Sequence, residues 1–151
     1  MKNRKLAAFL GHHQTYAADT MLFIYHFEDH KRYAPITERL LEAWENGTHR
    51  GITSSITLLE VLVKPKRDDN LDAVRDYRDL LLTFPNLQLI PVNVECAETA
   101  SDLRARYGIK TPDAIQIAAG ILGGATAFLT NDDQLKHVTE IEVVLLEELA
   151  R

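Results

Sequence analysis

The sequence predicts an α/β fold, a three-layer α/β/α sandwich with a central, mostly parallel twisted sheet. Short apolar runs alternate with segments of helical period along the 151 residues, and strands that alternate with single helices or helix pairs favour a parallel sheet covered on both faces. The sequence contains no internal repeat, low-complexity segment or Pro/Gly-rich linker. We therefore expect one domain over residues 1–151, in which residues 1–13 form a helical N-terminal extension.

The first half of the chain predicts strands and helices in alternation. The apolar run 6–10 is too short for a signal-peptide core or a membrane span, so we expect one short helix that ends at Gly11. Strands are expected over 15–18 and 51–53. Further helices are expected over 20–28, over 36–44 before Asn46-Gly47, and over 54–63, where Pro65 stops the helix.

The second half continues the same alternation. A helix is expected over 71–81, and a strand follows over 87–92. A helix over 96–107 precedes Gly108, which suits the left-handed conformation after a helix end. The remaining elements are a helix over 112–122, a strand over 126–130, a short helix, and a final strand over 141–145. Ligand sites in such sheets form beyond the carboxyl ends of the strands, so the side chains that follow strands are the first candidates for a site.

Composition and charge exclude several classes of protein. Hydrophobic residues make up 46% and charged residues 26% of the chain, which argues against disorder. Lys and Arg total 17 against 22 Asp and Glu, a net charge of -5, so nucleic-acid binding through a basic surface alone is not expected. Cys96 is the single cysteine, which excludes an internal disulfide and favours a reducing, cytoplasmic compartment. No membrane association is expected either.

Two carboxylates follow predicted strands. Asp19 comes directly after the first predicted strand. Asp132 follows the fourth predicted strand, from which Asn131 separates it. Taken alone, Asp19 is explained as the N-cap of the next helix, and Asn131-Asp132-Asp133 is ordinary turn chemistry.

A third carboxylate, Glu60, lies in an apolar helix. It shares a face with Ile56, Leu59 and Val63 at helical spacing, which predicts a carboxylate on a buried stripe. A buried lone carboxylate is costly unless it is paired or bound to a metal. Glu60 is therefore either a metal ligand or the partner of a buried Arg, and a strand in place of the helix would change its face.

The fourth carboxylate, Asp113, opens a helix. With Thr111 as N-cap and Pro112 at the first helical position, Asp113 falls in the first turn, where the helix dipole alone explains a negative charge. The rest of this helix, 114–122, carries no charge and is expected to be buried.

Together the four carboxylates suggest a metal site. Clustered carboxylates repel one another and raise each other's pKa values unless cations bind between them. Mg2+ prefers oxygen ligands, and two such ions about 3.5–4 Å apart can activate water and stabilise the leaving oxygen of a phosphodiester. The candidate ligands are Asp19, Glu60, Asp113 and Asp132.

The ordered set of motifs resembles the PIN-domain family. The motifs are Asp19-Thr20, Glu60, Thr111-Pro112-Asp113-Ala114 and Thr130-Asn131-Asp132, and they span about residues 14–146. PIN domains are metal-dependent ribonucleases, and many small ones are VapC-type toxins paired with a VapB-type antitoxin. The resemblance implies that the four carboxylates bind one or two Mg2+ or Mn2+ ions, that helices flank a parallel sheet, and that the protein is a homodimer.

Three features depart from the family pattern or add to it. Met21 stands where the family usually has Asn or Ser, which removes a polar group near the metal. The extension 1–13 precedes the first strand, where the family usually starts. Asp133 is an additional acid beside Asp132, either a group that supports the ligands or a surface residue.

The resulting hypothesis is hydrolysis of RNA phosphodiester bonds by a Mg2+- or Mn2+-dependent endoribonuclease. The resemblance implies 5′-phosphate and 3′-hydroxyl products, with Glu60 as a ligand or as the group that orients water. Thr20, Thr130 and Asn131 are candidates to hydrogen-bond the ligands, although Thr20 is also explained as a cap residue. Two bound divalent ions would bring the net charge from -5 to about -1.

Two basic clusters are candidates to steer RNA. One comprises Arg104, Arg106 and Lys110, close to Asp113, and the other lies within 64–67. Each is equally explained as a solvated surface or as an antitoxin contact.

The sequence leaves two alternative functions open. Met21 supports a PIN-like scaffold that has lost catalysis and acts by binding proteins, and the same acids suit a housekeeping RNA-processing nuclease without an antitoxin. Other hydrolases are disfavoured because His-Glu-x-x-His and Gly-x-Ser-x-Gly motifs are missing from the sequence.

Overall fold

The computed structural model describes residues 3–151 and contains one five-stranded sheet in which neighbouring strands are parallel. The strand order is β3-β2-β1-β4-β5. The strands are β1 (Thr15–Ala18), β2 (Arg50–Ser54), β3 (Leu87–Ile90), β4 (Ala127–Thr130) and β5 (Glu142–Leu145). The predicted α/β class is confirmed, and within the described residues the sheet is entirely parallel.

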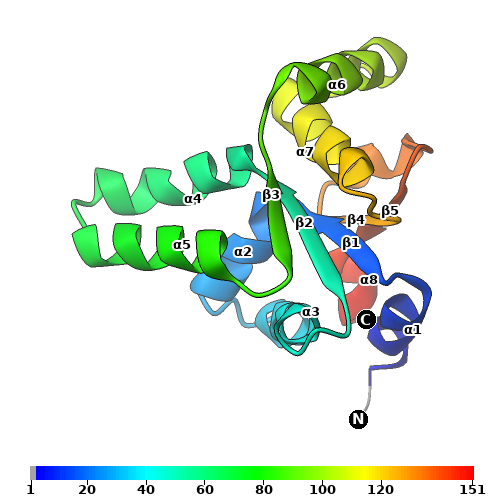
Figure 1. Cartoon of the computed structure of the whole chain (residues 1–151). Coiled ribbons are helices and arrows are strands. Elements are labelled where there is room, and N and C mark those ends of the chain that lie inside the picture. Colours follow the sequence, from blue (N-terminus) through cyan, green and yellow to red (C-terminus); the bar gives the residue numbers. More distant parts are fainter. Residues whose placement is uncertain (1–2) are drawn as a thin grey trace.

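Eight α-helices and one 3-10 helix surround the sheet within residues 3–151 (Figure 1). They are α1 (Arg4–His12), α2 (Thr20–Phe27), α3 (Ala34–Glu45), α4 (Ser55–Arg67), α5 (Leu71–Thr83), α6 (Val94–Tyr107), α7 (Thr111–Leu122), η1 (Asp133–His137) and α8 (Leu146–Ala150). The paired helices α4 and α5 project away from the sheet, whereas α6 and α7 pack together on its other side (Figure 1). No helix in this described part is both long and apolar enough to cross a membrane.

Side chains of the strands alternate between two cores, one on each face of the sheet. In β1, Tyr16 and Ala18 lie in the core formed with α1, α2, α3 and α8, whereas Ala17 belongs to the core formed with α6 and α7. In β4, Leu129 belongs to the first core and Phe128 to the second. Because helices cover both faces, residues of β1 and β4 are buried on both sides of the sheet, and the predicted three-layer sandwich is confirmed.

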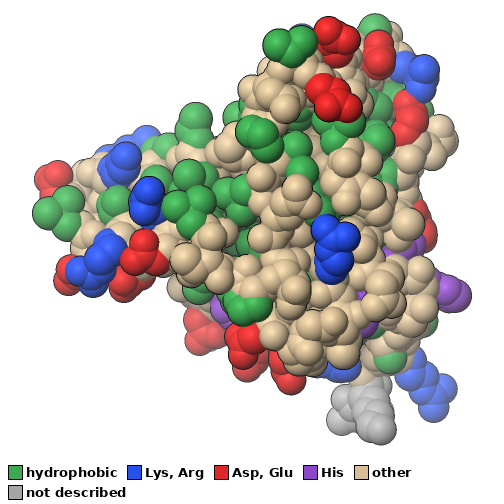
Figure 2. Space-filling view, in the orientation of Figure 1, with side chains coloured by type: hydrophobic (Ala, Val, Ile, Leu, Met, Phe, Trp, Pro, Cys, Tyr) green, Lys and Arg blue, Asp and Glu red, His purple; other side chains and the backbone are tan. Residues whose placement is uncertain are grey.

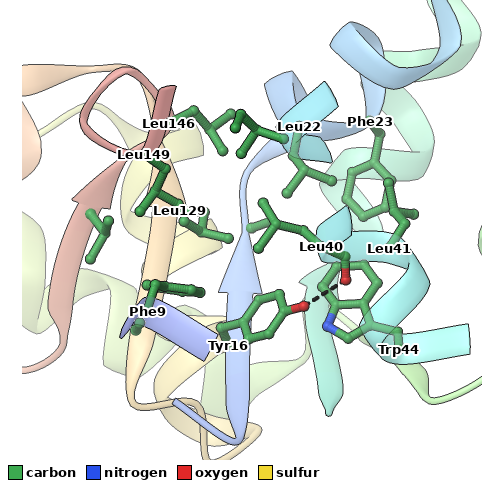
Figure 3. Close-up of a cluster of buried hydrophobic side chains, with 14 of the residues drawn as sticks. Phe9, Tyr16, Leu22, Phe23, Leu40, Leu41, Trp44, Leu129, Leu146 and Leu149 are labelled. Carbon is green, nitrogen blue, oxygen red and sulfur yellow. Dashed lines mark hydrogen bonds between the residues drawn. The ribbon is translucent and has the colours of Figure 1, made fainter. Parts of the chain in front are cut away.

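Aromatic side chains fill the first core around Tyr16 (Figure 3). The centroid of the Tyr16 ring lies 5.2 Å from that of Trp44 and 5.3 Å from that of Phe9. The Tyr16 hydroxyl donates to the backbone oxygen of Leu40 over 2.5 Å, and burial raises the pKa of this phenol far above its ordinary value. Trp44 lies directly against Gly51 of β2, where an added Cβ would come within 2.3 Å of Trp44 Cε2.

Replacing Gly51 with Ala is therefore expected to destabilise the protein by about 2 kcal/mol, because the fully buried Trp44 has to move to admit a methyl group. Gly11→Ala is the matched control, since Gly11 lies in α1 and no atom lies within 4 Å of an added Cβ. Ala should stabilise that helix by up to about 1 kcal/mol. Urea unfolding measures both changes, and a Gly51→Ala variant as stable as the wild type would contradict the packing.

The N-terminal extension forms part of the first core. Leu6 and Phe9 of α1 are buried, and α1 packs on α8. The Asn3 side chain accepts from the backbone N–H of Leu6 over 3.0 Å and donates to the backbone oxygen of Leu149 over 2.5 Å. The predicted helix is confirmed, although α1 continues through Gly11 instead of ending there; residues 1 and 2 of the extension lie outside the described residues.

Several helix ends differ from the prediction. Helix α4 does not stop at Pro65 but continues to Arg67, because burial of the Pro65 ring offsets the backbone hydrogen bond that proline cannot make. Helix α7 begins one residue early, with Lys110 as N-cap and Thr111 already helical. Gly108 closes α6 with a φ of 67°, as predicted. The short helix α8 was not predicted.

Candidate active site

Asp19 and Asp132 follow the neighbouring strands β1 and β4 at the carboxyl edge of the sheet. Asp19 accepts from the backbone N–H of Met21, and Asp132 accepts from that of Gln134, each over 3.0 Å. The Thr130 hydroxyl donates to Asp19 Oδ2 over 2.6 Å and accepts from the backbone N–H of Asp132 over 3.1 Å. Both residues are therefore N-caps, and the same hydrogen bonds fix both carboxylates at one edge of the sheet.

Glu60 and Asp113 reach this edge from helices α4 and α7. Asp19, Glu60 and Asp113 line one open pocket of about 460 Å³, which we call the acidic pocket. Asp113 also lines a smaller pocket of about 180 Å³ together with Asp132. Since the two pockets share Asp113, the structure brings all four predicted carboxylates to one region of the molecule.

The surroundings of Glu60 differ from the prediction. On the same face of α4, Leu59 is 60% and Val63 42% exposed, and Glu60 is exposed beside them, because α4 packs into the core through residues such as Val61. The predicted buried stripe is therefore wrong, and these apolar residues form a wall of the acidic pocket instead. The alternative that Glu60 pairs with a buried Arg is also wrong, because within residues 3–151 Glu60 forms no ion pair. Its carboxylate accepts from the Thr20 hydroxyl over 2.6 Å.

Burial and, to a smaller degree, the crowding of negative charge raise the pKa values of Asp19 and Asp113. Burial raises the pKa of Asp19 to about 6; hydrogen bonds to its oxygens oppose this rise, and the Asp113 and Glu60 carboxylates add to it. Burial also raises the pKa of Asp113, and the charges of Asp132 and Glu60 act in the same direction, against Lys110. A cation bound between these groups would offset the cost of burying their charges and would reduce the repulsion between them.

The donor set fits a hard divalent cation. All four candidate ligands are carboxylates, the oxygen donors that Mg2+ prefers. Across residues 3–151, no three His, Cys, Asp or Glu side chains lie close enough together to form a metal-binding cluster. Mg2+ usually binds only one or two protein carboxylates and completes its coordination with water and substrate oxygens. The open arrangement therefore suits Mg2+ or Mn2+ and does not suit a structural zinc ion.

The other residues predicted near the ligands fall into two groups. Thr20 and Thr130 donate directly to Glu60 and Asp19. Asn131 is engaged elsewhere: its amide nitrogen donates to the Tyr25 hydroxyl over 3.3 Å, and its amide oxygen accepts from the backbone N–H of Glu147 over 2.9 Å. Asn131 thus ties the loop after β4 to α2 and α8. The additional acid, Asp133, is exposed in the first turn of η1.

The members of the predicted basic cluster have different surroundings. Arg104 Nε donates to the backbone oxygen of Ile109 over 2.9 Å, and Arg106 forms an ion pair with Glu140. The Arg104 guanidinium holds the segment that joins α6 to α7, whereas that of Arg106 ties α6 to the segment before β5. Lys110 lines the smaller pocket beside Asp113, so it is the member of the cluster best placed to meet a phosphate.

Sequence reasoning missed Gln116, which lines the acidic pocket and is 3% exposed. The signal for it was present, because Gln116 is a polar amide among the otherwise apolar residues 114–122, one turn after Asp113. Its hydrogen-bond partners come from distant parts of the chain, which no spacing rule connects.

Fold and site together define an α/β protein with an acidic pocket at the carboxyl edge of a parallel sheet. A family model described as the PIN domain matches residues 16–141. The chain therefore belongs to the PIN-domain family. No curated protein matches the chain.

Solved structures show the same fold. VapBC2 from Rickettsia felis, bound to a DNA fragment from its promoter, is 18% identical with a TM-score of 0.69 over 87% of this chain and 98% of that chain. A toxin-antitoxin complex from Klebsiella pneumoniae is 23% identical with a TM-score of 0.63 over 86% of this chain and 96% of that one. DNA-bound VapBC from Salmonella typhimurium is 18% identical with a TM-score of 0.65 over 87% and 98%. At these identities the likeness establishes the fold alone.

Proposed function

We propose that this PIN-domain protein is a Mg2+- or Mn2+-dependent endoribonuclease and the VapC-type toxin of a type II toxin–antitoxin pair. The observation that carries the proposal is the convergence of Asp19, Glu60, Asp113 and Asp132, from four separate segments, on two adjoining pockets. Membership of the PIN-domain family and the likeness of the fold to VapBC complexes support it.

The four carboxylates would hold one or two divalent ions. Such ions, when bound, supply Lewis-acid activation of water and neutralise the charge that develops on the leaving oxygen. Thr130 holds Asp19, and Thr20 holds Glu60, each through a hydroxyl donor 2.6 Å away, so that both ligands are oriented before the substrate arrives. Met21 contributes its backbone N–H to Asp19, while its apolar side chain joins the wall of the acidic pocket.

The direct test is cleavage of a fluorescent single-stranded RNA by the purified protein. Cleavage is expected with Mg2+ or Mn2+, with 5′-phosphate products, and should stop when EDTA is added in excess. If the folded protein leaves several RNAs intact at millimolar Mn2+, the nuclease proposal fails and the scaffold alternative is favoured.

Substrate affinity is expected to depend on Lys110, because an RNA strand across the acidic region needs a cation beside the carboxylates. Lys110→Glu should raise KM for RNA about 10-fold with a smaller change in kcat. Lys5→Glu is the matched control, since it makes the same change in net charge and Lys5 is exposed in α1, on the other side of the fold. Steady-state cleavage at fixed ionic strength measures both, and equal KM increases in the two variants would reduce the effect to net charge alone.

We also infer that a VapB-type antitoxin binds in the groove between α2, α4 and α5. This groove has a volume of about 280 Å³ and an apolar floor in which Phe27 and Tyr77 stack with centroids 4.2 Å apart. It shares Ile24 and Glu60 with the acidic pocket, so a peptide in the groove would reach the metal site. Co-purification with the product of a short neighbouring reading frame tests this inference, and the interaction should be lost in Ala73→Arg, which fills the groove.

The exposed apolar face of α4 supports the expected homodimer. Leu59 and Val63 of α4 are exposed together with Val92 and Val94, and the Val92 N–H donates to Ser55 Oγ over 3.3 Å, which joins the start of α4 to the segment before α6. Figure 2 shows hydrophobic side chains over α4 and near its junction with α6. A surface of this kind is typical of a protein interface. Light scattering should give twice the 17.1 kDa chain mass, and a monomer would contradict the inference.

A further inference from the structure

Gln116 lies at the centre of a buried polar network beneath the acidic pocket. Its Nε2 group donates to Thr57 Oγ1 over 2.8 Å and to Thr20 Oγ1 over 3.1 Å. Its Oε1 atom accepts from Ser54 Oγ over 2.7 Å. All of these partners are buried or nearly so, and burial of a polar group is costly unless it is hydrogen-bonded. The network therefore defines a single arrangement of side chains.

The direction of each hydrogen bond in this network follows from its end points. The Thr53 hydroxyl donates to the backbone oxygen of Ala18 over 2.9 Å, and a carbonyl can only accept. In the 2.7 Å contact between Thr53 and Thr57, Thr57 must therefore be the donor. Since its proton is used there, Thr57 accepts from Gln116, which orients the Gln116 amide with its nitrogen toward the two threonines.

The second proton of the Gln116 nitrogen is thereby directed to Thr20. Thr20 accepts this bond, and its own proton has two acceptors within reach, Thr57 Oγ1 at 3.4 Å and Glu60 Oε1 at 2.6 Å. The shorter bond, to a carboxylate that can only accept when ionised, is the stronger of the two. Glu60 is exposed, and the Thr20 hydroxyl is its one hydrogen-bond donor within residues 3–151. The orientation of Thr20 consequently decides where this flexible side chain is held.

We propose that Gln116 is a positioning residue for the metal site: by donating to Thr20 it commits the Thr20 hydroxyl to Glu60 and holds that carboxylate over the acidic pocket. Gln116 acts through Thr20 and does not itself bind the cation. The inference rests on the proposed function, because it assumes that Glu60 is a ligand. It predicts that Gln116 contributes to metal affinity only while Thr20 carries a hydroxyl.

A double-mutant cycle tests this coupling. Gln116→Met keeps the length of the side chain and removes its donors, and Thr20→Val keeps the shape of the side chain and removes its hydroxyl. Mn2+ affinity is measured from the rise in melting temperature with Mn2+ concentration, which requires no substrate. Each single variant should bind Mn2+ about 5- to 10-fold more weakly, and Gln116→Met should add less than about 2-fold in the Thr20→Val background.

Three further measurements separate positioning from a merely structural role. Gln116→Met should lower kcat for RNA with little change in KM, because the residue does not touch the substrate. Thr20→Ser, which retains a hydroxyl, should recover most of the affinity lost in Thr20→Val. The matched control is Gln88→Met, since Gln88 is exposed in β3, and it should bind Mn2+ as the wild type does.

The outcomes distinguish this inference from the function on which it rests. If Glu60→Gln weakens Mn2+ binding but Gln116→Met leaves it unchanged, or if the effects of Gln116→Met and Thr20→Val multiply fully, the positioning role is overturned and the metal site stands. If Mn2+ does not stabilise the wild-type protein at any concentration, the proposed function is overturned together with this inference.

Discussion

Replacing Asp19 with Asn is expected to lower kcat for metal-dependent RNA cleavage by at least about 100-fold, the scale seen when one preorganised electrostatic group is removed from an active site. Asp19 is held by the Thr130 hydroxyl and the Met21 N–H at the carboxyl edge of β1, where it faces Glu60 and Asp113 across the acidic pocket. Asn retains the shape and the oxygen that caps α2, so the variant should fold. What it loses is the charge that attracts the cation and the second oxygen, which accepts from the Thr130 hydroxyl.

The measurement is the initial rate of RNA cleavage as a function of Mn2+ concentration. Asp102→Asn is the matched control, because Asp102 is exposed in α6 and lies outside both the acidic pocket and the smaller pocket beside it. This variant should cleave RNA at the wild-type rate. A folded Asp19→Asn protein with undiminished kcat at saturating Mn2+ would show that Asp19 is only a helix cap. The alternative weighed from the sequence, capping without catalysis, would then be the correct interpretation of this residue.

The order of strands and helices could be predicted because local signals and the final packing agree. Gly108 adopts a positive φ at the end of α6, as its position after a helical period indicated. The prediction that a helix stops at Pro65 was wrong because here the local signal and the packing disagree. Proline disfavours a helix interior, but its ring is buried and α4 continues past it. Burial against other segments is a tertiary property that a local rule does not contain.

The carboxylates could be located in sequence more reliably than their surroundings. Asp19 and Asp132 follow strands, and neighbouring parallel strands bring their carboxyl ends together, so these two positions were predictable from topology. Periodicity placed Glu60 on an apolar face of α4 but could not show that Leu59 on that face is 60% exposed. An apolar stripe indicates that something covers it or that it lines a pocket, and only the packing of the other helices distinguishes these cases.

The partners in the polar network under the site could not be predicted from the sequence. Gln116 hydrogen-bonds Thr20 and Thr57, which precede it by 96 and 59 positions. The absence of charge from residues 114–122 predicts a buried helix, but it does not indicate what the one amide within it contacts. Such a side chain gains its role only when the topology brings the starts of α2, α4 and α7 together.

The substitution that lowers kcat, Asp19→Asn, should raise the stability of the metal-free protein. Asp19 has a pKa of about 6 in the folded protein, raised mainly by burial from about 3.8. A raised folded-state pKa means that the folded protein binds the proton more tightly than the unfolded chain does. This contribution to stability is fully present below about pH 3.8 and is lost as the pH rises through about 6.

We therefore expect the metal-free wild-type protein to be less stable than Asp19→Asn at pH 8, by at most about 3 kcal/mol, and the two to converge toward pH 4. The upper limit follows from the two pKa values, and partial access of solvent to the side chain reduces it. Urea unfolding in EDTA between pH 4 and pH 8 measures the difference, which should grow as the pH rises to about 6 and then level off. Saturating Mn2+ should remove it by stabilising the wild type alone. If the stabilities of the two proteins change in parallel with pH, burial does not disfavour the charged form of Asp19. The electrostatic argument for a cation at this site would then lose its basis.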